Sequence, residues 1–244
     1  MKTKPLVSII LTLYEIKPEY LNECIDSLLK QTYKKIEIIA INDCSPTVNY
    51  DYLKKRSKKI KLIKNEVNLG MNKSVNKAFK HATGKYIVRL GSDDFFDPTL
   101  IEKEVKVLES DDRIGAVCCE LKRFGDKEQH IHRPKIWNLK NIVMDRKING
   151  AGYAGGMMFR SSLLDKISIN ENYRMCEDFD FHLQILENMP IASIHEVLYF
   201  YRAHATNLCK SVKDVERINY IRTILQEHKE IYINKKSIQK SVKK

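Results

Sequence analysis

Short apolar runs alternate with segments of helical spacing through the first hundred residues. Four runs are apolar and rich in β-branched residues, which is typical of buried strands, and they cover residues 6–13, 35–43, 60–66 and 85–90. Helical patterns follow them at residues 18–32, from about Val48, at 70–82 and after Pro98. Strands that alternate with helices predict a mostly parallel sheet covered by helices on both faces.

The second half of the chain has a less regular pattern. It predicts a strand over 113–124, one or two strands over 191–204, and a helix over 176–189. Residues 150–167 are glycine-rich, then apolar, then helical in pattern. We expect a last amphipathic helix over about 212–233 and disorder only at the extreme tail.

Polar side chains follow three predicted strands at their carboxyl ends. They are Asp43, the segment Gly91-Ser92-Asp93-Asp94, and the group Thr12, Tyr14 and Glu15. In parallel sheets ligands bind beyond these ends. Adjacent aspartates suit a divalent cation such as Mg²⁺ or Mn²⁺, which keeps positions open for phosphate oxygens. The alternative is that Asp93 and Asp94 cap the next helix or shape a turn.

Composition and charge leave several partners open. The chain has 244 residues, a 43% hydrophobic fraction and a net charge of +12, with lysines concentrated at 53–64 and 234–244. Nucleic acid, an anionic membrane or an acidic substrate suits such charge, and so does a solvated surface. The first apolar run is too short to span a membrane, and we expect no signal peptide. Six cysteines without a C-x-x-C pair favour a reducing, cytoplasmic setting.

Five motifs occur in an order that resembles the nucleotide-sugar-dependent family 2 glycosyltransferases. They are "PLVSIILTLYE", "LLKQTYKKIEIIAINDCSPT", "NEVNLGMNKSVNKAFKHATGKYIVRLGSDDFFDP", "CEDFDFHLQIL" and "YFYRAHATN". The resemblance implies an α/β protein of the GT-A type, with a Rossmann-like, mostly parallel sheet flanked by helices and a C-terminal amphipathic helix. It implies a glycosyltransferase domain at 1–208, with a nucleotide-binding half (1–110) and an acceptor-side half (111–208). A C-terminal helix and basic tail follow at 209–244.

The same resemblance implies roles for individual residues. Those expected at the nucleotide are Thr12, Tyr14, Glu15, Asp43, Lys73 and Asp93, with Asp43 accepting hydrogen bonds from the base, typically uracil. Asp93 and His204 are expected to hold a divalent metal, manganese or magnesium, at the diphosphate. Asp178 matches the catalytic base, and Gly155, Gly156 and Glu177 match positions near the donor and acceptor sugars.

The chain departs from the family pattern at three places. Gly91 stands where the family has the first aspartate of D-x-D, and Asn42 replaces the first aspartate of D-D-G-S. Ser74-Val75-Asn76 replaces A-R-N, and Lys73 is the candidate substitute for the lost arginine. The expected metal site therefore depends on Asp93 and His204, with Asp94 beside them.

The implied reaction explains why these residue types are needed. Cleaving a sugar from a diphosphate puts negative charge on the leaving group, which a divalent cation neutralises. The acceptor hydroxyl must lose its proton during attack, and a placed carboxylate can take it. A single base, Asp178, opposite the leaving group predicts inversion at the anomeric carbon. Without the family context, the favoured explanation of Glu177-Asp178 is charge at a helix N-terminus.

Other polar or aromatic residues have alternative explanations. His130 and His132 have the H-x-H spacing of a metal site on a strand, but we favour a surface loop. Tyr199 and Tyr201 could stack on a base or sugar, and we favour packing. Trp137 suits a sugar platform or packing equally.

The sequence therefore predicts an inverting glycosyltransferase. It is expected to move one sugar from a nucleotide sugar, typically a UDP sugar, to a hydroxyl of a glycan or lipid-linked acceptor, in surface polysaccharide or glycoconjugate synthesis. We expect a cytoplasmic protein whose basic tail either contacts the anionic inner face of the membrane or packs on the domain. We expect no nucleic acid partner. The alternatives are a nucleotidyltransferase, a nucleic-acid-binding protein and a catalytically inactive relative.

Overall fold

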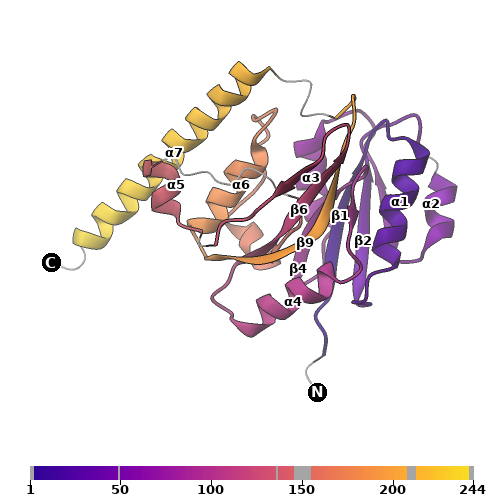
Figure 1. The fold of residues 1–244 in the computed structure, drawn as a ribbon, viewed down its shortest axis with the longest axis horizontal. Coiled ribbons are helices and arrows are strands. Elements are labelled where there is room, and N and C mark those ends of the chain that lie inside the picture. Colours follow the sequence, from indigo (N-terminus) through magenta and orange to yellow (C-terminus); the bar gives the residue numbers. More distant parts are fainter. Residues whose placement is uncertain (1–2, 49, 136, 146–154, 208–212, 242–244) are drawn as a thin grey trace.

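Among the residues that the structure describes, a single mixed sheet of nine strands forms the centre, with helices on both faces (Figure 1). The computed structural model describes residues 3–48, 50–135, 137–145, 155–207 and 213–241. The strands are β1 (Val7–Leu13), β2 (Ile36–Asn42), β3 (Ile60–Lys64), β4 (Tyr86–Gly91), β5 (Phe95–Phe96), β6 (Ala116–Gly125), β7 (Gln129–Ile131), β8 (Met157–Arg160) and β9 (Ile191–Ala203). The spatial order is β3-β2-β1-β4-β8-β6-β9-β5, and β7 pairs with β6.

Seven α-helices and one 3₁₀-helix surround the sheet in the described part of the chain. They are α1 (Pro18–Leu29), α2 (Tyr50–Arg56), α3 (Met71–Phe79), α4 (Leu100–Ser110), α5 (Leu139–Asp145), the 3₁₀-helix η1 (Ser161–Asp165), α6 (Glu177–Leu186) and α7 (Asp214–Ser241). No helix in these described residues combines the length and apolar character that a membrane crossing requires.

Two hydrophobic cores lie on opposite faces of the sheet. Side chains alternate along a strand, so Ile9 and Leu11 of β1 pack in one core and Ile10 packs in the other. The first core contains side chains from α1, α2 and α4, and the second contains side chains from α3, α5, α6 and α7. The predicted α/β architecture with helices on both faces is confirmed.

The parallel part of the sheet follows the sequence pattern. Strands β3, β2, β1 and β4 run parallel, which brings the ends of β1, β2 and β4 to one edge. Thr12 lies opposite Gly91 in the β1–β4 register and opposite Ile41 in the β1–β2 register. The residues that follow these strands therefore share the edge that the sequence analysis expected.

The second half contains the errors of prediction. The apolar part of 150–167 is strand β8, antiparallel between β4 and β6, and the part predicted helical is the short η1. All four residues of β8 are buried, and a continuous apolar run carries no period that separates a strand from a helix. The predicted surface loop around His130 is strand β7, paired with β6. Helix α7 continues to Ser241 instead of ending near 233, so the lysine-rich tail is helical that far.

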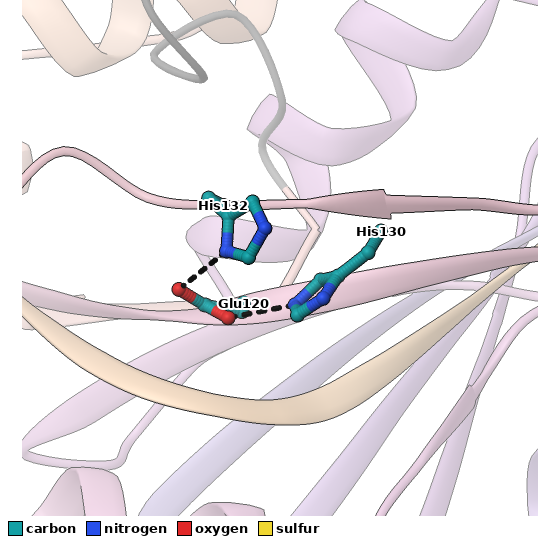
Figure 2. Close-up of side chains that lie close together, drawn as sticks. All are labelled: Glu120, His130 and His132. Atoms are coloured by element: carbon teal, nitrogen blue, oxygen red, sulfur yellow. Dashed lines mark hydrogen bonds and ion pairs between the residues drawn. The ribbon is translucent and has the colours of Figure 1, made fainter.

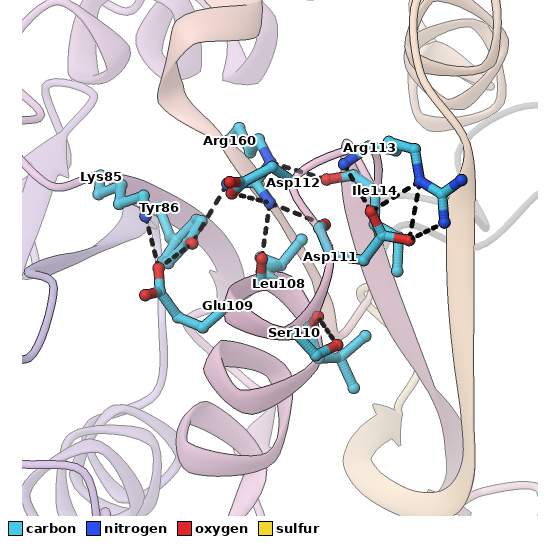
Figure 3. A network of polar contacts seen from close by, with 11 residues as sticks. Lys85, Tyr86, Leu108, Glu109, Ser110, Asp111, Asp112, Arg113, Ile114 and Arg160 are labelled. Atoms are coloured by element: carbon cyan, nitrogen blue, oxygen red, sulfur yellow. Dashed lines mark hydrogen bonds and ion pairs between the residues drawn. The ribbon is translucent and has the colours of Figure 1, made fainter.

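Arg160 fixes the end of β8 to the far end of α4 (Figure 3). Its guanidinium donates from Nε to the Ile114 carbonyl at 2.7 Å and from Nη2 to the Leu108 carbonyl at 2.6 Å. The same group lies over the Tyr86 ring, 5.5 Å from the centroid. Because these carbonyls belong to a helix end and a loop, a buried cation satisfies backbone groups that would otherwise lack partners.

Helix α7 is joined to α6 by a buried histidine. His228 on α7 lies 2.9 Å through Nε2 from Asp180 and 2.7 Å through Nδ1 from Glu187. Burial alone lowers the pKa of His228, but the hydrogen bonds to the two carboxylates outweigh it and raise the pKa from 6.5 to about 9. The imidazolium form therefore belongs to the native packing of α7 against the helix that carries Asp178.

This histidine predicts a pH-dependent stability in the alkaline range. A pKa raised on folding contributes stability that is complete below pH 6.5 and is lost as the pH rises through about 9. The shift corresponds to about 3 kcal/mol at most. We expect the thermal unfolding midpoint of the wild-type protein to decrease as the pH rises from 6.5 to 9. For His228→Gln we expect a lower midpoint that changes less with pH. Thermal unfolding at several pH values measures this, with the exposed His81→Gln as control. The same decrease with pH in the wild type and in His228→Gln would contradict the assignment.

Candidate active site

A cavity of about 920 Å³ opens at the carboxyl ends of β1 and β4. It extends from these strand ends to the first turns of α6 and α7 and to β6, β7 and β9. Five of the residues that the sequence analysis placed in the site line it: Thr12, Asp93, Gly155, Glu177 and Asp178. Five cationic side chains line it as well: Arg89, Arg123, Arg174, Lys213 and Arg217.

Asp93 and His204 meet at this cavity, although 111 positions separate them in the chain. Nε2 of His204 lies 2.9 Å from Oδ2 of Asp93, and Nδ2 of Asn207 lies 3.3 Å from the same oxygen. Adjacent ligands of an octahedral Mg²⁺ with bonds of 2.0–2.1 Å are about 2.9 Å apart. A carboxylate oxygen and an imidazole nitrogen at this separation therefore fit a small divalent cation.

The neighbouring Asp94 has a different position. Its buried carboxylate accepts hydrogen bonds from the Tyr199 hydroxyl at 2.5 Å and from the Arg202 backbone N–H at 2.7 Å. Burial first, and then the Asp93 charge, raise the pKa of Asp94 well above its usual value. Asp94 thus joins the end of β4 to β9, and Asp93 is the member of the pair with a cavity-side imidazole partner.

Arg202 supports the same junction from the outside. Its Nε donates to the Asp93 carbonyl at 2.9 Å, and its guanidinium lies between two rings, 4.4 Å from Tyr20 and 4.7 Å from Phe124. The His204 ring also packs against the Tyr20 ring, with 5.4 Å between the ring centroids. Stacking and backbone hydrogen bonds therefore fix both Asp93 and the histidine that faces it.

The geometry at Gly91 explains the departure from D-x-D. A Cβ atom at this position would lie 2.7 Å from Oδ2 of Asp94 and 2.9 Å from Oδ1 of Asp93. Both carboxylates are held by other partners, so neither is free to yield without breaking a hydrogen bond. In this arrangement the strand end has no room for a side chain at position 91.

Glu177 and Asp178 begin α6 at the cavity wall. Cys176 precedes them with a left-handed backbone (φ 64°), which turns the chain into the helix. Oδ1 of Asp178 lies 3.2 Å from Nη1 of Arg89 on β4. Burial, and then the Asp178 charge, raise the pKa of Glu177 well above its usual value, against the effect of Arg89. Burial therefore disfavours the charged form of Glu177, and Asp178 is the carboxylate paired with the arginine.

Gly155 and Gly156 form the wall beside Tyr199. A Cβ atom at Gly155 would lie 2.9 Å from the Tyr199 ring, and one at Gly156 would lie 2.5 Å from Sγ of Cys119. Gly156 also has a positive φ of 66°, which glycine adopts without strain. Arg133 donates to the Gly155 carbonyl. The two glycines therefore let the backbone pack directly against Tyr199 and Cys119, and Gly155 lines the cavity.

The remaining nucleotide-site predictions lie near the cavity but outside its lining. Tyr14 is exposed, and the backbone N–H of Glu15 (φ 44°) donates to Ser45 Oγ at 2.9 Å. Lys73 lies on the exposed side of α3. The cavity therefore does not bring these three together with Asp93 and Asp178.

Asp43 is buried at the end of β2 and organises the loop before α3. Its carboxylate accepts from Nδ2 of Asn65 at 2.9 Å and from the backbone N–H groups of Leu69 and Gly70, each at 2.8 Å. Asn65 in turn donates to Ser74, which replaces the alanine of the family motif, at 2.9 Å. This network shapes the edge between β2 and α3.

Several cavity residues escaped the sequence analysis. Tyr199 and Tyr201, for which packing was favoured, both line the cavity, although Tyr199 also belongs to the core. Arg89 is a charged residue inside an otherwise apolar strand, and that exception was a usable signal. Arg123, Arg174 and Arg217 lie in segments without a motif, so nothing in their spacing pointed to the site.

Comparisons with known proteins agree with this arrangement. Residues 8–168 match the model of the family described as glycosyl transferase family 2. An uncharacterized glycosyltransferase of Haemophilus influenzae is 33% identical over 96% of this chain and 76% of its own length. The uncharacterized glycosyltransferase MJ1057 of Methanocaldococcus jannaschii is 32% identical over 82% of this chain and 71% of its own length.

Solved structures share the fold at low sequence identity. TarS of S. aureus (residues 1–349), in complex with UDP-GlcNAc, has a TM-score of 0.72 and 20% identity over 85% of this chain. The mannosyltransferase PcManGT of Pyrobaculum calidifontis, in complex with GDP-Man and Mn²⁺, has a TM-score of 0.65 and 17% identity over 86% of this chain. This chain spans about three-fifths of each, 61% and 60%.

The predicted resemblance and fold class are confirmed, and the alternatives of a nucleotidyltransferase and a nucleic-acid-binding protein lose their support. The family match covers more than half of the chain, and the relatives extend it through α6 and β9. The chain therefore belongs to glycosyl transferase family 2, and it is a glycosyltransferase with the GT-A fold.

Proposed function

We propose that this glycosyltransferase moves a single sugar, with inversion, from a UDP sugar to a hydroxyl of a glycan or lipid-linked acceptor. The observation that carries the proposal is that Asp93, with His204 against it, and Asp178, with Arg89 against it, line one cavity. A site for a metal-bound diphosphate and a proton acceptor beside the same space are what direct displacement requires. The complexes of TarS with UDP-GlcNAc and PcManGT with GDP-Man support a nucleotide-sugar donor.

The nucleotide half is proposed to be residues 1–110, at the ends of β1 and β2. Thr12, Tyr14 and Glu15 follow β1, and we assign them to the walls around the nucleoside. A carboxylate has about four acceptor sites, and the three N–H donors on Asp43 leave one for an N–H of the base. Lys73, exposed on α3, is proposed to approach the phosphates only when the donor is bound.

The diphosphate is assigned to the part of the cavity next to Asp93. Asp93 and His204 would hold the divalent cation, with manganese supported by the PcManGT complex. When bound, such a cation offsets the negative charge that develops on the departing diphosphate. Arg202 and Asn207 keep Asp93 and His204 in place, through the Asp93 carbonyl and the His204 backbone N–H.

The acceptor half is proposed to be residues 111–208, with Asp178 as the base. Asp178 takes the proton of the attacking hydroxyl, and Arg89 holds the carboxylate at 3.2 Å and stabilises its charge before attack. Glu177, whose charged form is disfavoured by burial, is assigned to hydrogen bonds with a sugar hydroxyl. Gly155, which lines the cavity with Tyr199, and the adjacent Gly156 are assigned to the region of the sugars.

The acceptor is proposed to carry phosphate. Five acidic residues line the cavity beside the five cationic ones, and Arg89 and Arg217 pair with two of them, Asp178 and Asp214. The other three cations, Arg123, Arg174 and Lys213, are the groups that we assign to an acceptor phosphate. A lipid-linked or phosphate-containing glycan supplies the negative charge that these cations match, and the lysine-rich end of α7 suits peripheral contact with an anionic membrane.

Cys24, Cys44, Cys118, Cys119 and Cys176 are free thiols, which supports a reducing, cytoplasmic setting.

Replacing the proposed base tests the mechanism directly. We expect Asp178→Asn to lower kcat by about 10²–10⁴-fold, because the hydroxyl then loses its proton acceptor, and to leave donor binding within about twofold. Donor turnover under saturating acceptor and nucleotide affinity by calorimetry measure the two effects. The exposed Asp112→Asn is the control. Equal rates for Asp178→Asn and wild type would remove Asp178 from the mechanism.

Replacing Asp93 tests the metal site apart from catalysis. We expect Asp93→Asn to weaken Mn²⁺-dependent UDP binding by at least about tenfold, since a neutral amide is a poorer cation ligand than a carboxylate. The metal-independent part of UDP binding is expected to stay unchanged. Titrations with Mn²⁺ and with EDTA separate the two parts, with the exposed Asp165→Asn as control. If UDP binding is the same with and without Mn²⁺ in the wild type, the metal assignment is wrong.

Restoring the family aspartate at position 91 is expected to damage the site. Gly91→Asp and Gly91→Ala both add a Cβ that approaches the Asp93 and Asp94 oxygens, so both should lose about 1–3 kcal/mol of stability. Gly91→Asp should gain no affinity for metal or UDP. Unfolding midpoints and UDP titrations test this. A stable Gly91→Asp variant with tighter Mn²⁺-dependent binding would show that the departure weakens the enzyme.

A further inference from the structure

Three polar side chains converge on the outer part of the sheet, outside the lining of the active-site cavity. They are Glu120 of β6, His130 of β7 and His132 just after β7 (Figure 2). Side chains alternate along paired strands, and the intervening Leu121 and Ile131 line the cavity. Glu120, His130 and His132 therefore project from the opposite face of the same two strands.

The ligand atoms of these residues are close enough for one ion. Nε2 of His130 lies 2.7 Å from one carboxylate oxygen of Glu120, and Nδ1 of His132 lies 3.2 Å from the other. One ligand atom from each residue lies within 4.8 Å of the other two. The two rings are 4.0 Å apart between centroids, so both nitrogens approach the carboxylate from one side.

Tetrahedral coordination sets the distances that such ligands need. With Zn–N and Zn–O bonds of about 2.0–2.2 Å, two ligands of one Zn²⁺ are about 3.3 Å apart. The distance from His132 Nδ1 to Oε1 of Glu120 is close to this value. His130 Nε2 lies 2.7 Å from the other oxygen, Oε2, so the His130 ring must retreat by roughly half an ångström for the three groups to share one ion. His130 and His132 are exposed at 42% and 71%, so both rings have space to adjust, while Glu120 is fixed at 8%.

His195 of β9 supports the carboxylate from a third direction. Its Nδ1 lies 3.3 Å from the Glu120 oxygen that His132 approaches. Residues that hold a metal ligand by hydrogen bonding fix its orientation. His195 is therefore a positioning residue for Glu120.

We propose that Glu120, His130 and His132 form a second metal site, for a transition metal of the zinc class, with a water as the fourth ligand. Two imidazoles and one carboxylate are a ligand set suited to Zn²⁺, Co²⁺ or Ni²⁺. It differs from the proposed set at Asp93 and His204, where phosphate oxygens of the donor would complete the coordination of Mg²⁺ or Mn²⁺.

The site has a structural role in the acceptor-side wall. An ion held by these ligands joins the short β7 to β6 through side chains as well as through the ladder. Arg133 follows His132 directly and donates to the Cys119 carbonyl at 2.6 Å and to the Gly155 carbonyl. Fixing β7 therefore fixes both Ile131 in the cavity wall and the arginine that holds Gly155.

Cobalt substitution tests the site with a signal that does not depend on catalysis. Protein treated with EDTA is titrated with Co²⁺, whose four-coordinate complexes absorb visible light far more strongly than six-coordinate ones. The experiment uses the full chain carrying Asp93→Asn and His204→Asn, which removes the other metal site. We expect the intense bands to saturate at one ion per chain and Zn²⁺ to abolish them. Zn²⁺ should also raise the unfolding midpoint.

Variants locate the ion. His130→Asn and His132→Asn are each expected to remove the intense bands and the Zn²⁺-dependent shift of the midpoint. His195→Asn should retain the bands and weaken affinity by about 10–100-fold. The exposed His81→Asn is the control. Circular dichroism in the absence of metal tests whether each variant is folded.

The competing explanation is a buried carboxylate that only accepts hydrogen bonds from histidines, and it predicts no bound ion. Absence of the intense bands and of any Zn²⁺-dependent midpoint shift in the folded protein would overturn the proposal. So would bands that persist unchanged in the double variant His130→Asn/His132→Asn. Neither result would bear on the proposed donor site, because Asp93 and His204 are tested separately with Mn²⁺.

Discussion

The site depends on one buried carboxylate. Asp94 accepts the hydroxyl of Tyr199 and the backbone N–H of Arg202, and so holds β9 against the end of β4 although their residues are more than a hundred positions apart in the chain. Removing a carboxylate from water is unfavourable unless donors replace the water, and both donors come from β9. His204 follows β9 directly, so the hydrogen bonds that offset the burial of Asp94 also bring His204 to Asp93.

This junction changes how the aspartate pair is understood. In the sequence the two carboxylates are equivalent neighbours. In the structure both line the cavity, but Asp94 is buried and bonded to β9, whereas Asp93 faces the imidazole of His204. The absence of a side chain at Gly91 belongs to the same arrangement, because the space beside it is filled by the two carboxylates. The glycine that departs from the family motif thus accompanies close packing of the two aspartates that remain, Asp93 and Asp94.

The sequence predicted the parallel half of the sheet well because local signals and topology agree there. Each strand is a short apolar run, each helix separates two strands, and the strand ends must share an edge. It predicted the pairing of Asp93 with His204 only through the family motif, since nothing local connects the two. Strand β8 was missed because a fully buried four-residue strand has no polar alternation. Strand β7 was missed because two of its three residues, Gln129 and His130, are polar and exposed.

The contact between Tyr199 and Gly155 has a consequence for how related chains vary. Ring atoms of Tyr199 lie 2.9 Å from where a Cβ of residue 155 would stand, and the hydrogen bond from its hydroxyl to Asp94 opposes a shift of the ring. Substitutions at these two positions are therefore interdependent. A related protein with a small residue at the position of Tyr199 has space for a side chain opposite it, and one that keeps the tyrosine must keep the glycine.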